Sequence, residues 1–352
     1  MDRRDFLIAG GAAAVAATTP AAVQAAELPA PRIRADAERL RLAMPWADTP
    51  HGPADSARRL ARRFETMTDG RYRIEFTGVG AGPQAEADLL HGPVHDFLPQ
   101  HPAFSYFGGL PGTGGLSAQD LARWVAIGGG QMLWDDLAAP HGWKSLLAGH
   151  SGDAPPLWTR EPIAGLSDLA GQRISAPGLG SDVSRALGAE AYPAVAPHAA
   201  AEALAEGAVD AVEAGDLANS LAAGLANVAR CATGHGLNGR GTTHALSVRL
   251  SLWESLSDAD KLILAAAAAE EYQLNLAEAR AHAGLARQVL EARGVVFAPW
   301  PADIADALER VAEATIAHVA SRDAAAARIN QSYMAFRALI SGSGAPRQAE
   351  IS

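Results

Sequence analysis

The sequence predicts an α/β fold with two lobes. Three observations support this prediction. The chain has 352 residues, which is enough for two domains. A strand, helix and strand pattern covers residues 39–79, and a second alternation of strands and helices begins near residue 157. Apolar residues make up 49% of the chain, so it can bury a core of this size.

The first unit is predicted to contain a parallel sheet. RLRLAMPW, residues 39–46, is a strand pattern, and an amphipathic helix follows over 54–70 and ends at a glycine. RYRIEFTGV, residues 71–79, alternates as a strand does. Residues 80–115 are rich in Gly, Pro and His and predict loops or short helices, whereas 117–142 predict helix on both sides of a triple glycine. Strand, helix and strand in this order favour parallel pairing.

The second unit begins near residue 157 with a short helical turn, a strand and a helix. Residues 198–215 predict a helix and then a short strand, and residues 216–232 predict a further helix. TTHALSVRL, residues 242–250, is a strand pattern, and a long helix follows from about Ser257 to Arg293. Two more helical segments complete the C-terminus, so several segments are expected to cross between the lobes.

The predicted domain boundaries follow from these patterns. Residues 27–156 together with 242–275 are expected to form the first lobe. Residues 157–241 together with 276–340 are expected to form the second lobe, and residues 341–352 a flexible tail.

The N-terminus matches a twin-arginine export signal. Arg3 and Arg4 precede Phe6, Leu7 and a mildly apolar Ala/Gly run. Small residues near position 25 satisfy the rule for signal cleavage, so residues 1–26 are predicted to be removed. The run is too short and too rich in alanine to span a membrane stably. We therefore expect a periplasmic protein that is not itself embedded in the membrane.

Composition excludes several classes of function. The net charge of −10 argues against an extended nucleic-acid interface, which needs a basic face. Cys231 is the single cysteine, so neither an internal disulfide nor a thiolate-rich metal cluster can form. The pair His91 and His95 has a metal-compatible spacing, but Gly92 and Pro93 interrupt the helix it would need. We predict no metal site and no cofactor.

Catalytic motifs are also missing from the sequence. GHSGD, residues 149–153, does not fit a nucleophile elbow, because glycine follows the serine directly. GLGSD lacks the lysine of a phosphate-binding loop, and the triple glycine lacks the fingerprint of a dinucleotide turn. No acid–base pair or nucleophile set is visible, so the sequence predicts a binding protein and not an enzyme.

Several motifs in a shared order resemble the DctP-type solute-binding proteins of TRAP transporters. They are HPAFSYFGGLP, GGGQMLWDDLAAPHG, SDLAGQRISAPGLGSDVSRALGA, AEALAEGAVDAVEAG, SVRLSLWESLSDADKLIL and INQSYMAFR. The likeness is greatest to the branch that binds 2-oxo acids and other monocarboxylates. It implies a two-lobed periplasmic protein of the type II-like class, in which the long helix spans both lobes. It also implies closure around a small organic solute and transfer to a TRAP membrane permease.

The resemblance places the family's carboxylate-binding arginine at Ser175. The family pattern K-I-R-x-P-G-L-G-G aligns with Arg173, Ile174, Ser175 and the turn Pro177–Gly180. Arginine suits this role because its planar guanidinium pairs both oxygens of a carboxylate. Arg173 lies on the same face of the strand but about 7 Å further back. The scaffold is retained, whereas the charge is missing.

Further family positions have lost large or polar side chains. Alanine occupies three positions where the family pattern has a larger side chain: Ala154 replaces a glutamine, Ala201 a tyrosine and Ala214 a tryptophan. Glu213 of the family's D-A-A-E-W motif is kept. About eight residues of the family pattern are absent before the HPAF segment. Together these differences predict a larger and more neutral cleft.

The remaining candidate ligand-binding residues come from the same comparison. Trp46 and Trp158 match family aromatics, and Asn219 matches a polar position after the glutamate motif. Arg240, in a glycine-bracketed loop before a strand, is the best replacement for the missing anchor. With Arg173, Ser175 and Glu213 these residues form the predicted site.

Three interpretations of the changed cleft remain open at this point. It holds a bulkier and less charged molecule, or another residue replaces the anchor, or ligand binding has been lost. In the third case the protein is an accessory or scaffold protein on the same fold.

Overall fold

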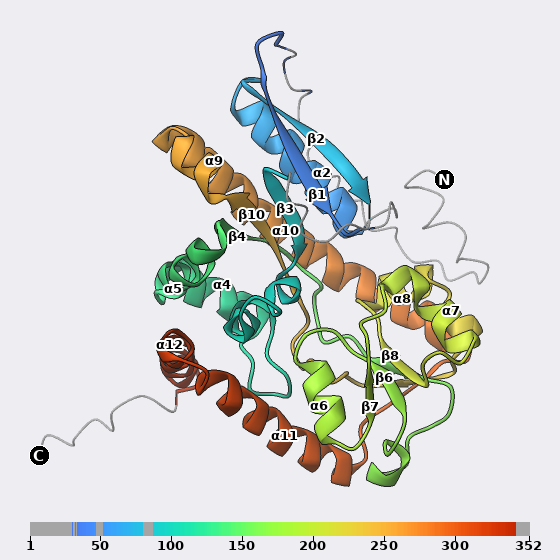
Figure 1. Ribbon diagram of the computed structural model, residues 1–352. Helices are drawn as coiled ribbons and strands as arrows, with labels where there is room; N and C mark the ends of the chain where they lie inside the picture. The colour runs from blue at the N-terminus through green and yellow to red at the C-terminus, as the bar shows by residue number, and fades with distance from the viewer. Residues whose placement is uncertain (1–29, 31, 33, 47–51, 80–86, 343–352) are drawn as a thin grey trace, which may run out of the picture.

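The computed structural model describes residues 30, 32, 34–46, 52–79 and 87–342. The predicted export signal and all but the first two residues of the predicted tail lie outside these residues. Within them, eleven strands form two sheets, which confirms the two-lobed α/β prediction (Figure 1).

The first sheet has five strands in the order β2-β1-β3-β10-β4. Its strands are β1 (Glu38–Met44), β2 (Tyr72–Val79), β3 (Leu89–Pro93), β4 (Trp143–His150) and β10 (Thr243–Arg249). β1 pairs in parallel with β2 and β3, whereas β10 lies antiparallel between β3 and β4. The helix α2 (Pro53–Met67) connects β1 to β2, as the sequence pattern predicted.

The second sheet has six short strands in the order β11-β9-β5-β8-β6-β7. Its strands are β5 (Leu157–Thr159), β6 (Arg173–Ser175), β7 (Glu190–Tyr192), β8 (Ala211–Glu213), β9 (Cys231–Thr233) and β11 (Val296–Ala298). The helices α6 (Gly180–Ala186), α7 (Ala200–Ala205) and α8 (Leu217–Ala222) connect its strands.

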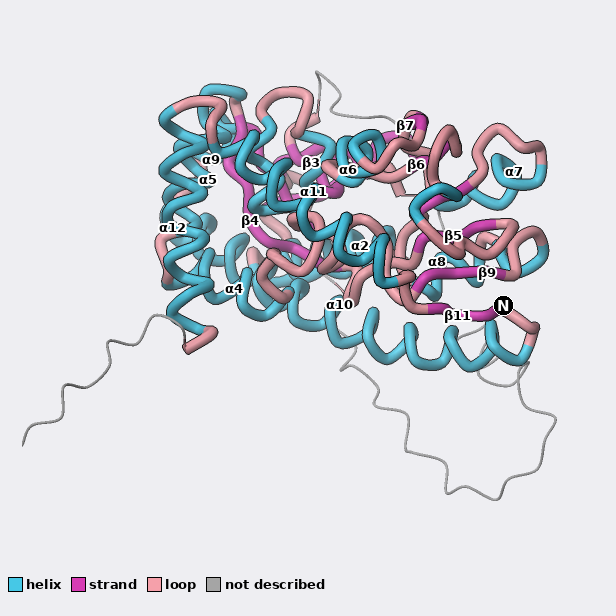
Figure 2. Tube along the Cα trace, turned by 90° about the horizontal axis from the view of Figure 1, so that it is seen from below, coloured by secondary structure: helices cyan, strands magenta, loops and turns pink. Residues whose placement is uncertain are grey.

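The long helix α10 (Asp258–Ala292) spans both lobes. It begins at Ser257, whose hydroxyl accepts a hydrogen bond from the Asp260 amide, and it ends before Gly294 at φ +85°. It packs on β4 and α2 of the first lobe and on α8 of the second, and Figure 2 shows it running along both. The short helix α9 (Leu250–Ser255) precedes it.

The structure corrects two elements of the sequence prediction. Residues 80–115 contain strand β3, because Leu89–Pro93 lies buried in the first sheet despite its histidine, glycine and proline. Residues 216–232 are not one helix: α8 ends at Ala222, and Cys231 already begins β9, which pairs with β5 and β11.

The triple glycine separates the helices α4 (Ala118–Ile127) and α5 (Gly130–Ala138). Gly129 has a φ of +83°, which an L-residue with a side chain rarely adopts. A Cβ on Gly128 or Gly130 would come within 2.9 Å of the side chain of Trp124. The glycines therefore let α5 turn closely against α4.

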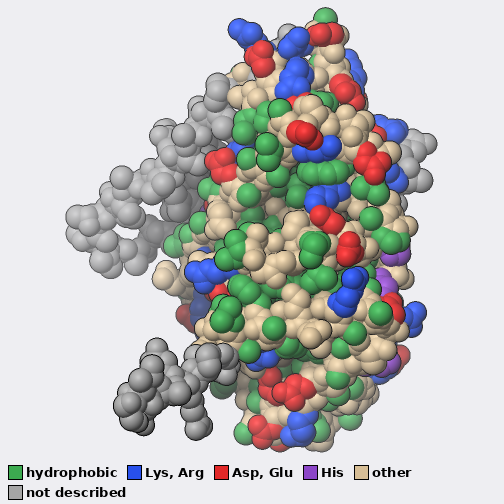
Figure 3. Space-filling view, turned by 90° about the vertical axis from the view of Figure 1, so that its left-hand side faces the viewer, with side chains coloured by type: hydrophobic (Ala, Val, Ile, Leu, Met, Phe, Trp, Pro, Cys, Tyr) green, Lys and Arg blue, Asp and Glu red, His purple; other side chains and the backbone are tan. Residues whose placement is uncertain are grey.

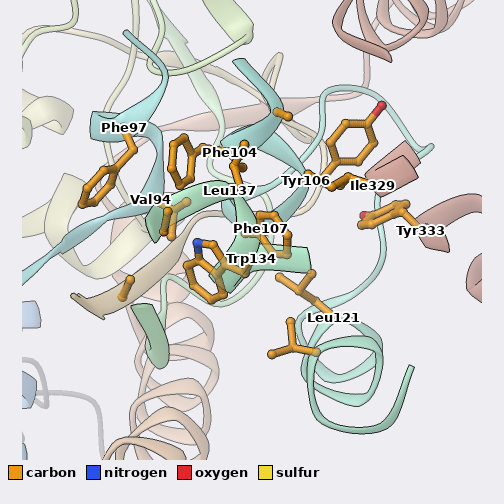
Figure 4. Close-up of a cluster of buried hydrophobic side chains, with 14 of the residues drawn as sticks. Val94, Phe97, Phe104, Tyr106, Phe107, Leu121, Trp134, Leu137, Ile329 and Tyr333 are labelled. Carbon is orange, nitrogen blue, oxygen red and sulfur yellow. The ribbon is translucent and has the colours of Figure 1, made fainter. Parts of the chain in front are cut away.

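The C-terminal helices divide between the lobes. α11 (Ala302–Ala320) packs on α6 of the second lobe, but α12 (Ala324–Ile340) packs on α5 and on α3 (Ser105–Gly108). Tyr333 of α12 meets Trp124 edge-on at 5.0 Å. Figure 4 shows Tyr333 within the cluster of buried apolar side chains that it joins. The predicted assignment of residues 276–340 to the second lobe is thus wrong for α12, and the other boundaries stay a prediction.

Two surface properties complete the description. Basic, acidic and apolar side chains are interspersed on the face shown in Figure 3. In the part of the chain that the structure describes, no helix has the length and apolarity to cross a membrane.

Candidate functional site

The two sheets direct loops toward a common cavity of about 450 Å³. In the first lobe, Trp46 follows β1, Asp96 follows β3 and Ser151 follows β4. In the second lobe, Pro177 follows β6 and Gly215 follows β8. In α/β sheets, ligands typically bind outside the carboxyl ends of the strands, and the volume suits a small molecule. This cavity is therefore the candidate functional site.

The cavity lining is mainly apolar, with polar groups from both lobes. The first-lobe side is lined by residues that follow its strands and by the start of β10, where the chain comes back from the second lobe: Pro45, Trp46, Pro53, Pro93, His95, Asp96, Ser151, Thr242 and His244. The other side is lined by Pro155, Pro177, residues 194–198, Glu213, Gly215, Asp216, Asn219, Ala222 and Ala223. None of these described lining residues is a lysine or an arginine.

Glu213 is buried at the end of β8 and is held by the segment that returns to the first lobe. Its Oε2 accepts hydrogen bonds from the amides of Leu237 (2.7 Å) and Asn238 (3.2 Å), and Oε1 accepts one from Asn238 Nδ2 (2.8 Å). Gly236 makes this approach possible, since a Cβ there would lie 2.4 Å from Oε2. Burial outweighs these hydrogen bonds and raises the pKa of Glu213 to about 7.

Asn238 joins three segments, because its Nδ2 also donates to the carbonyl of Pro177 at 2.8 Å. We expect Asn238→Ala to lower the free energy of unfolding by about 2 kcal/mol, since it leaves buried acceptors without a donor. Urea unfolding followed by circular dichroism measures this loss. Asn227→Ala, at an exposed position, is the matched control and should change stability by less than about 0.5 kcal/mol. Equal effects of the two substitutions would contradict the assigned role.

Asp96 is the first-lobe carboxyl of the cavity. Its side chain is 37% exposed, and among the described residues its nearest basic group is His95 Nε2, 3.8 Å from Oδ1. Burial alone raises the pKa of Asp96 to about 6 and lowers the pKa of His95 to about 4. At neutral pH a carboxylate therefore faces a neutral imidazole, and it has no formal counter-charge from that neighbour.

Trp46 lies against two buried histidines of the first sheet. Its Nε1 donates to His91 Nδ1 at 2.9 Å, and its ring lies 4.7 Å from that of His244. Burial lowers the pKa of His91 to about 4, and the pKa of His244 lies well below its usual value for the same reason. The aromatic wall of the cavity is thus backed by uncharged imidazoles.

The structure brings three of the predicted site residues together at the cavity. Trp46, Glu213 and Asn219 all line it. Asn219 is held by Asp216, which accepts hydrogen bonds from its amide (2.7 Å) and from Nδ2 (2.9 Å). Burial raises the pKa of Asp216. A role for these three residues in ligand binding remains a prediction.

Two predicted residues on β6 do not line the cavity. Arg173 forms a two-pronged ion pair with Asp210, through Nε at 3.0 Å and Nη2 at 2.9 Å, so its charge is already matched. Ser175 is buried: its hydroxyl donates to the carbonyl of Pro193 at 3.1 Å and accepts from the amide of Val195 at 2.9 Å. Ser175 thereby fixes the segment after β7, part of which forms the cavity wall.

Trp158 and Arg240 also lie away from the cavity lining. Trp158 is buried in the second-lobe core, where Nε1 donates to Ser220 Oγ at 3.2 Å. Arg240 is exposed, reaches the carbonyl of Thr113 at 3.4 Å and lines a separate pocket with Arg280. Arg240, which the sequence analysis expected at the ligand site, therefore does not line this cavity.

Sequence reasoning did not place Asp96 or His95 at the cleft, and it interpreted His244 as a structural residue. The first two follow β3, a strand that the sequence did not reveal. His244 lies in β10, where the pattern predicted a strand but not which side chains would meet Trp46.

Comparison with known proteins gives a consistent result. The family model of bacterial extracellular solute-binding proteins, family 7 (DctP), matches residues 48–322. A monocarboxylate 2-oxoacid-binding periplasmic protein of Nostoc sp. is 27% identical over 353 aligned residues, covering 96% of this chain and 94% of the relative.

Solved structures of TRAP solute-binding proteins share the fold. The protein of Bordetella bronchiseptica, with calcium and picolinate, has a TM-score of 0.81 and 22% identity, covering 87% of this chain and 94% of that one. The protein of Colwellia psychrerythraea, with calcium and pyruvate, has a TM-score of 0.80 and 21% identity, covering 87% and 96%.

The described residues offer no grouped set of carboxylate, imidazole or thiolate side chains for the cation that accompanies the ligand in those two structures. Calcium takes roughly six to eight oxygen ligands. Both carboxylate oxygens of Glu213 are engaged by the chain itself, and within the described ranges no three His, Cys, Asp or Glu side chains are grouped to hold a metal.

The match over residues 48–322 covers more than half of the sequence, so the chain belongs to the DctP family, family 7 of the bacterial extracellular solute-binding proteins.

Proposed function

We propose that this protein is the periplasmic receptor of a TRAP-type transporter and that it encloses a small organic solute without the carboxylate-binding arginine that the family pattern places at position 175. Export by the twin-arginine pathway and delivery to a TRAP permease are parts of the proposal. The observation that carries it is the interlobe cavity, whose described lining contains neither lysine nor arginine.

Ser175 supports the loss of the anchor. It occupies the position where the family pattern has arginine, and its hydroxyl is engaged by Pro193 and Val195. The nearest guanidinium in sequence, that of Arg173, is paired with Asp210. A carboxylate entering this cavity would lose its hydration and would meet Asp96 and not a cation. We therefore expect simple 2-oxo acids to bind poorly.

Closure of the lobes supports capture. The chain crosses between the sheets from β4 to β5 and from β9 to β10, and α10 runs along both lobes. Such crossings act as hinges in two-lobed proteins. A solute that contacts Trp46 in the first lobe and Asn219 in the second would favour the closed state, because only that state makes both contacts.

A thermal-shift screen tests the proposal. The purified mature protein is heated with pyruvate and other 2-oxo acids, with neutral polyols and amides, and with amines. We expect no stabilisation by 2-oxo acids and clear stabilisation by at least one compound of another charge class, because a ligand of the native state raises its stability by mass action.

The control is Trp46→Ala, which removes a wall of the cavity and should abolish the stabilisation. Stabilisation by pyruvate would contradict the proposed loss of the anchor. No stabilisation by any compound would contradict the receptor function and favour the accessory role on the same fold.

A further inference from the structure

The charge of the interlobe cavity indicates which solutes it accepts. Three carboxyl groups reach its lining: Asp96 from the first lobe, and Glu213 and Asp216 from the second. The internal segments that the structure does not describe, residues 47–51 and 80–86, contain no lysine or arginine in the sequence. Neither of these segments can therefore supply a lysine or arginine to the cavity.

The three carboxyl groups differ in their partners. Glu213 accepts three hydrogen bonds from the segment around Asn238, and Asp216 accepts two from Asn219. Asp96 receives no hydrogen bond from the described residues and has only His95 at 3.8 Å. Asp96 is thus the carboxylate that remains available to a ligand.

His95 does not neutralise Asp96. The imidazole of His95 is uncharged at neutral pH, because burial holds its pKa near 4. The pKa of Asp96, about 6, leaves its carboxylate ionised under the same conditions. A partly buried and unpaired negative charge attracts a positive group and repels an anion.

Trp46 and His244 form an uncharged aromatic wall on the first-lobe side of the cavity. His244 is 5% exposed and lines the cavity beside Trp46, and its Nδ1, which has no hydrogen-bond partner within the described residues, is buried against Gly149. The indole of Trp46 adds an aromatic face, and such faces attract ammonium groups. Six prolines supply much of the apolar lining: Pro45, Pro53, Pro93, Pro155, Pro177 and Pro197.

We infer that the solute of this cavity is a small organic cation whose ammonium group pairs with Asp96 and contacts Trp46. The apolar wall then encloses its alkyl groups. This inference rests on the proposed function, since it assumes that the cavity holds a solute. It reverses the charge of the ligand relative to the 2-oxo acids.

Three probes of nearly equal shape but different charge test the inference. Choline is positive, 3,3-dimethyl-1-butanol is its neutral carbon analogue, and 3,3-dimethylbutanoate is negative. Their binding to the mature protein is measured by calorimetry and by tryptophan fluorescence at about pH 7.5. We expect choline to bind about tenfold more tightly than the alcohol, and the carboxylate to bind most weakly.

Variants of Asp96 assign the effect to one side chain. Asp96→Asn should remove the advantage of choline over the alcohol, measured as the ratio of the two affinities. Asp96→Glu keeps the charge and should retain most of the advantage. Asp182→Asn is the matched control, because this exposed carboxylate pairs with Arg185 on α6 and does not line the cavity. Circular dichroism shows whether each variant is folded.

The outcomes separate this inference from the proposed function. If the alcohol or the carboxylate binds as tightly as choline and Trp46→Ala abolishes that binding, the cavity is a solute site but the inferred charge is wrong. If choline keeps its advantage in Asp96→Asn, the assignment to Asp96 is wrong. If none of the three probes binds, the inferred solute class is wrong, and the thermal-shift screen decides the proposed function separately.

Discussion

Lowering the pH from about 7 to about 5 is expected to reduce the free energy of unfolding by roughly 3 kcal/mol. The cause is a group of buried histidines at the end of the first sheet. His91, His150 and His244 are at most 5% exposed and lie on the adjacent strands β3, β4 and β10, and His95 follows β3. Burial lowers the pKa of His91, His95 and His150 to about 4 and places that of His244 well below its usual value.

Stability falls on acidification because the unfolded chain binds more protons at these histidines than the native state does. In the unfolded chain these histidines protonate as the pH falls through about 6.5, whereas in the native state they stay neutral until about pH 4. Their contribution is therefore complete above about pH 6.5 and is lost as the pH falls toward 4. Within this window, each histidine lowers the free energy of unfolding by about 1.4 kcal/mol for each pH unit of acidification. The effect of His95 is smaller, because its side chain is partly exposed.

Two carboxyls of the cavity act in the opposite direction. The pKa of Glu213 is raised to about 7 and that of Asp96 to about 6, so both bind a proton in the native state before they would in the unfolded chain. Their protonation recovers stability between about pH 7 and pH 5 and cancels roughly half of the histidine effect, with a smaller share from Asp96 because its side chain is 37% exposed. Asp216, whose pKa is also raised, adds to the recovery.

Urea unfolding at several pH values measures the net effect. His244→Phe keeps a ring against Trp46 but cannot titrate, so it should reduce the pH dependence by up to about 1.4 kcal/mol per pH unit. His318→Phe, at an exposed position on α11, is the control and should leave the slope unchanged. A midpoint that is the same at pH 5 and pH 7 would contradict the predicted effect of the histidine group.

The sequence predicted the long elements of the fold well. The helix α10 has a serine cap and acidic residues in its first turn, and a glycine ends it, so its limits could be predicted within two residues. Strand β3 was missed because Leu89–Pro93 contains His, Gly and Pro, which indicate a loop when burial is unknown. Strand β9 was missed because its three residues continue an alanine-rich pattern that favours helix.

Residues of the candidate site could be predicted from the sequence only where they belong to a recognisable motif. Ser175 could be placed by its motif, and Glu213 and Asn219, which the motifs also single out, line the cavity. The bond between Asn238 and Glu213 joins residues 25 apart in sequence, and no local pattern encodes it. The contact of Trp46 with His244 depends on strand order and register across the first sheet, which a single sequence does not determine.

Replacement of Glu271 by alanine is expected to cost about 3–5 kcal/mol of stability, the largest single effect that we predict. Glu271 lies on α10, is fully buried and faces α2. It accepts hydrogen bonds from Ser56 Oγ (2.8 Å), Arg59 Nη2 (2.7 Å) and Arg63 Nη1 (3.0 Å). The arginine side chains are 11% and 5% exposed, so Glu271→Ala leaves their charges poorly solvated.

Glu270→Ala is the matched control for this prediction. Glu270 precedes Glu271 on the same helix and lies 3.0 Å from Nε of the same Arg63, but its side chain is 64% exposed. Exposed ion pairs contribute at most about 1 kcal/mol, so the control should change the urea midpoint little. The two variants share the charge that is removed and one ion-pair partner, and they differ mainly in burial and in the number of partners.

The double variant Arg59→Ala/Glu271→Ala separates the loss of one ion pair from the burial of an arginine that has lost one of its two carboxylate partners. If the cost of Glu271→Ala comes mainly from the guanidinium of Arg59, which loses Glu271 but keeps the Glu278 carboxylate at 2.7 Å, the double variant should be less destabilised than the sum of the two single variants. Strict additivity, or an effect of Glu271→Ala as small as that of Glu270→Ala, would contradict this explanation. Because α2 belongs to the first lobe and α10 spans both, the same ion-pair cluster fixes the first lobe to the helix along which the lobes are joined.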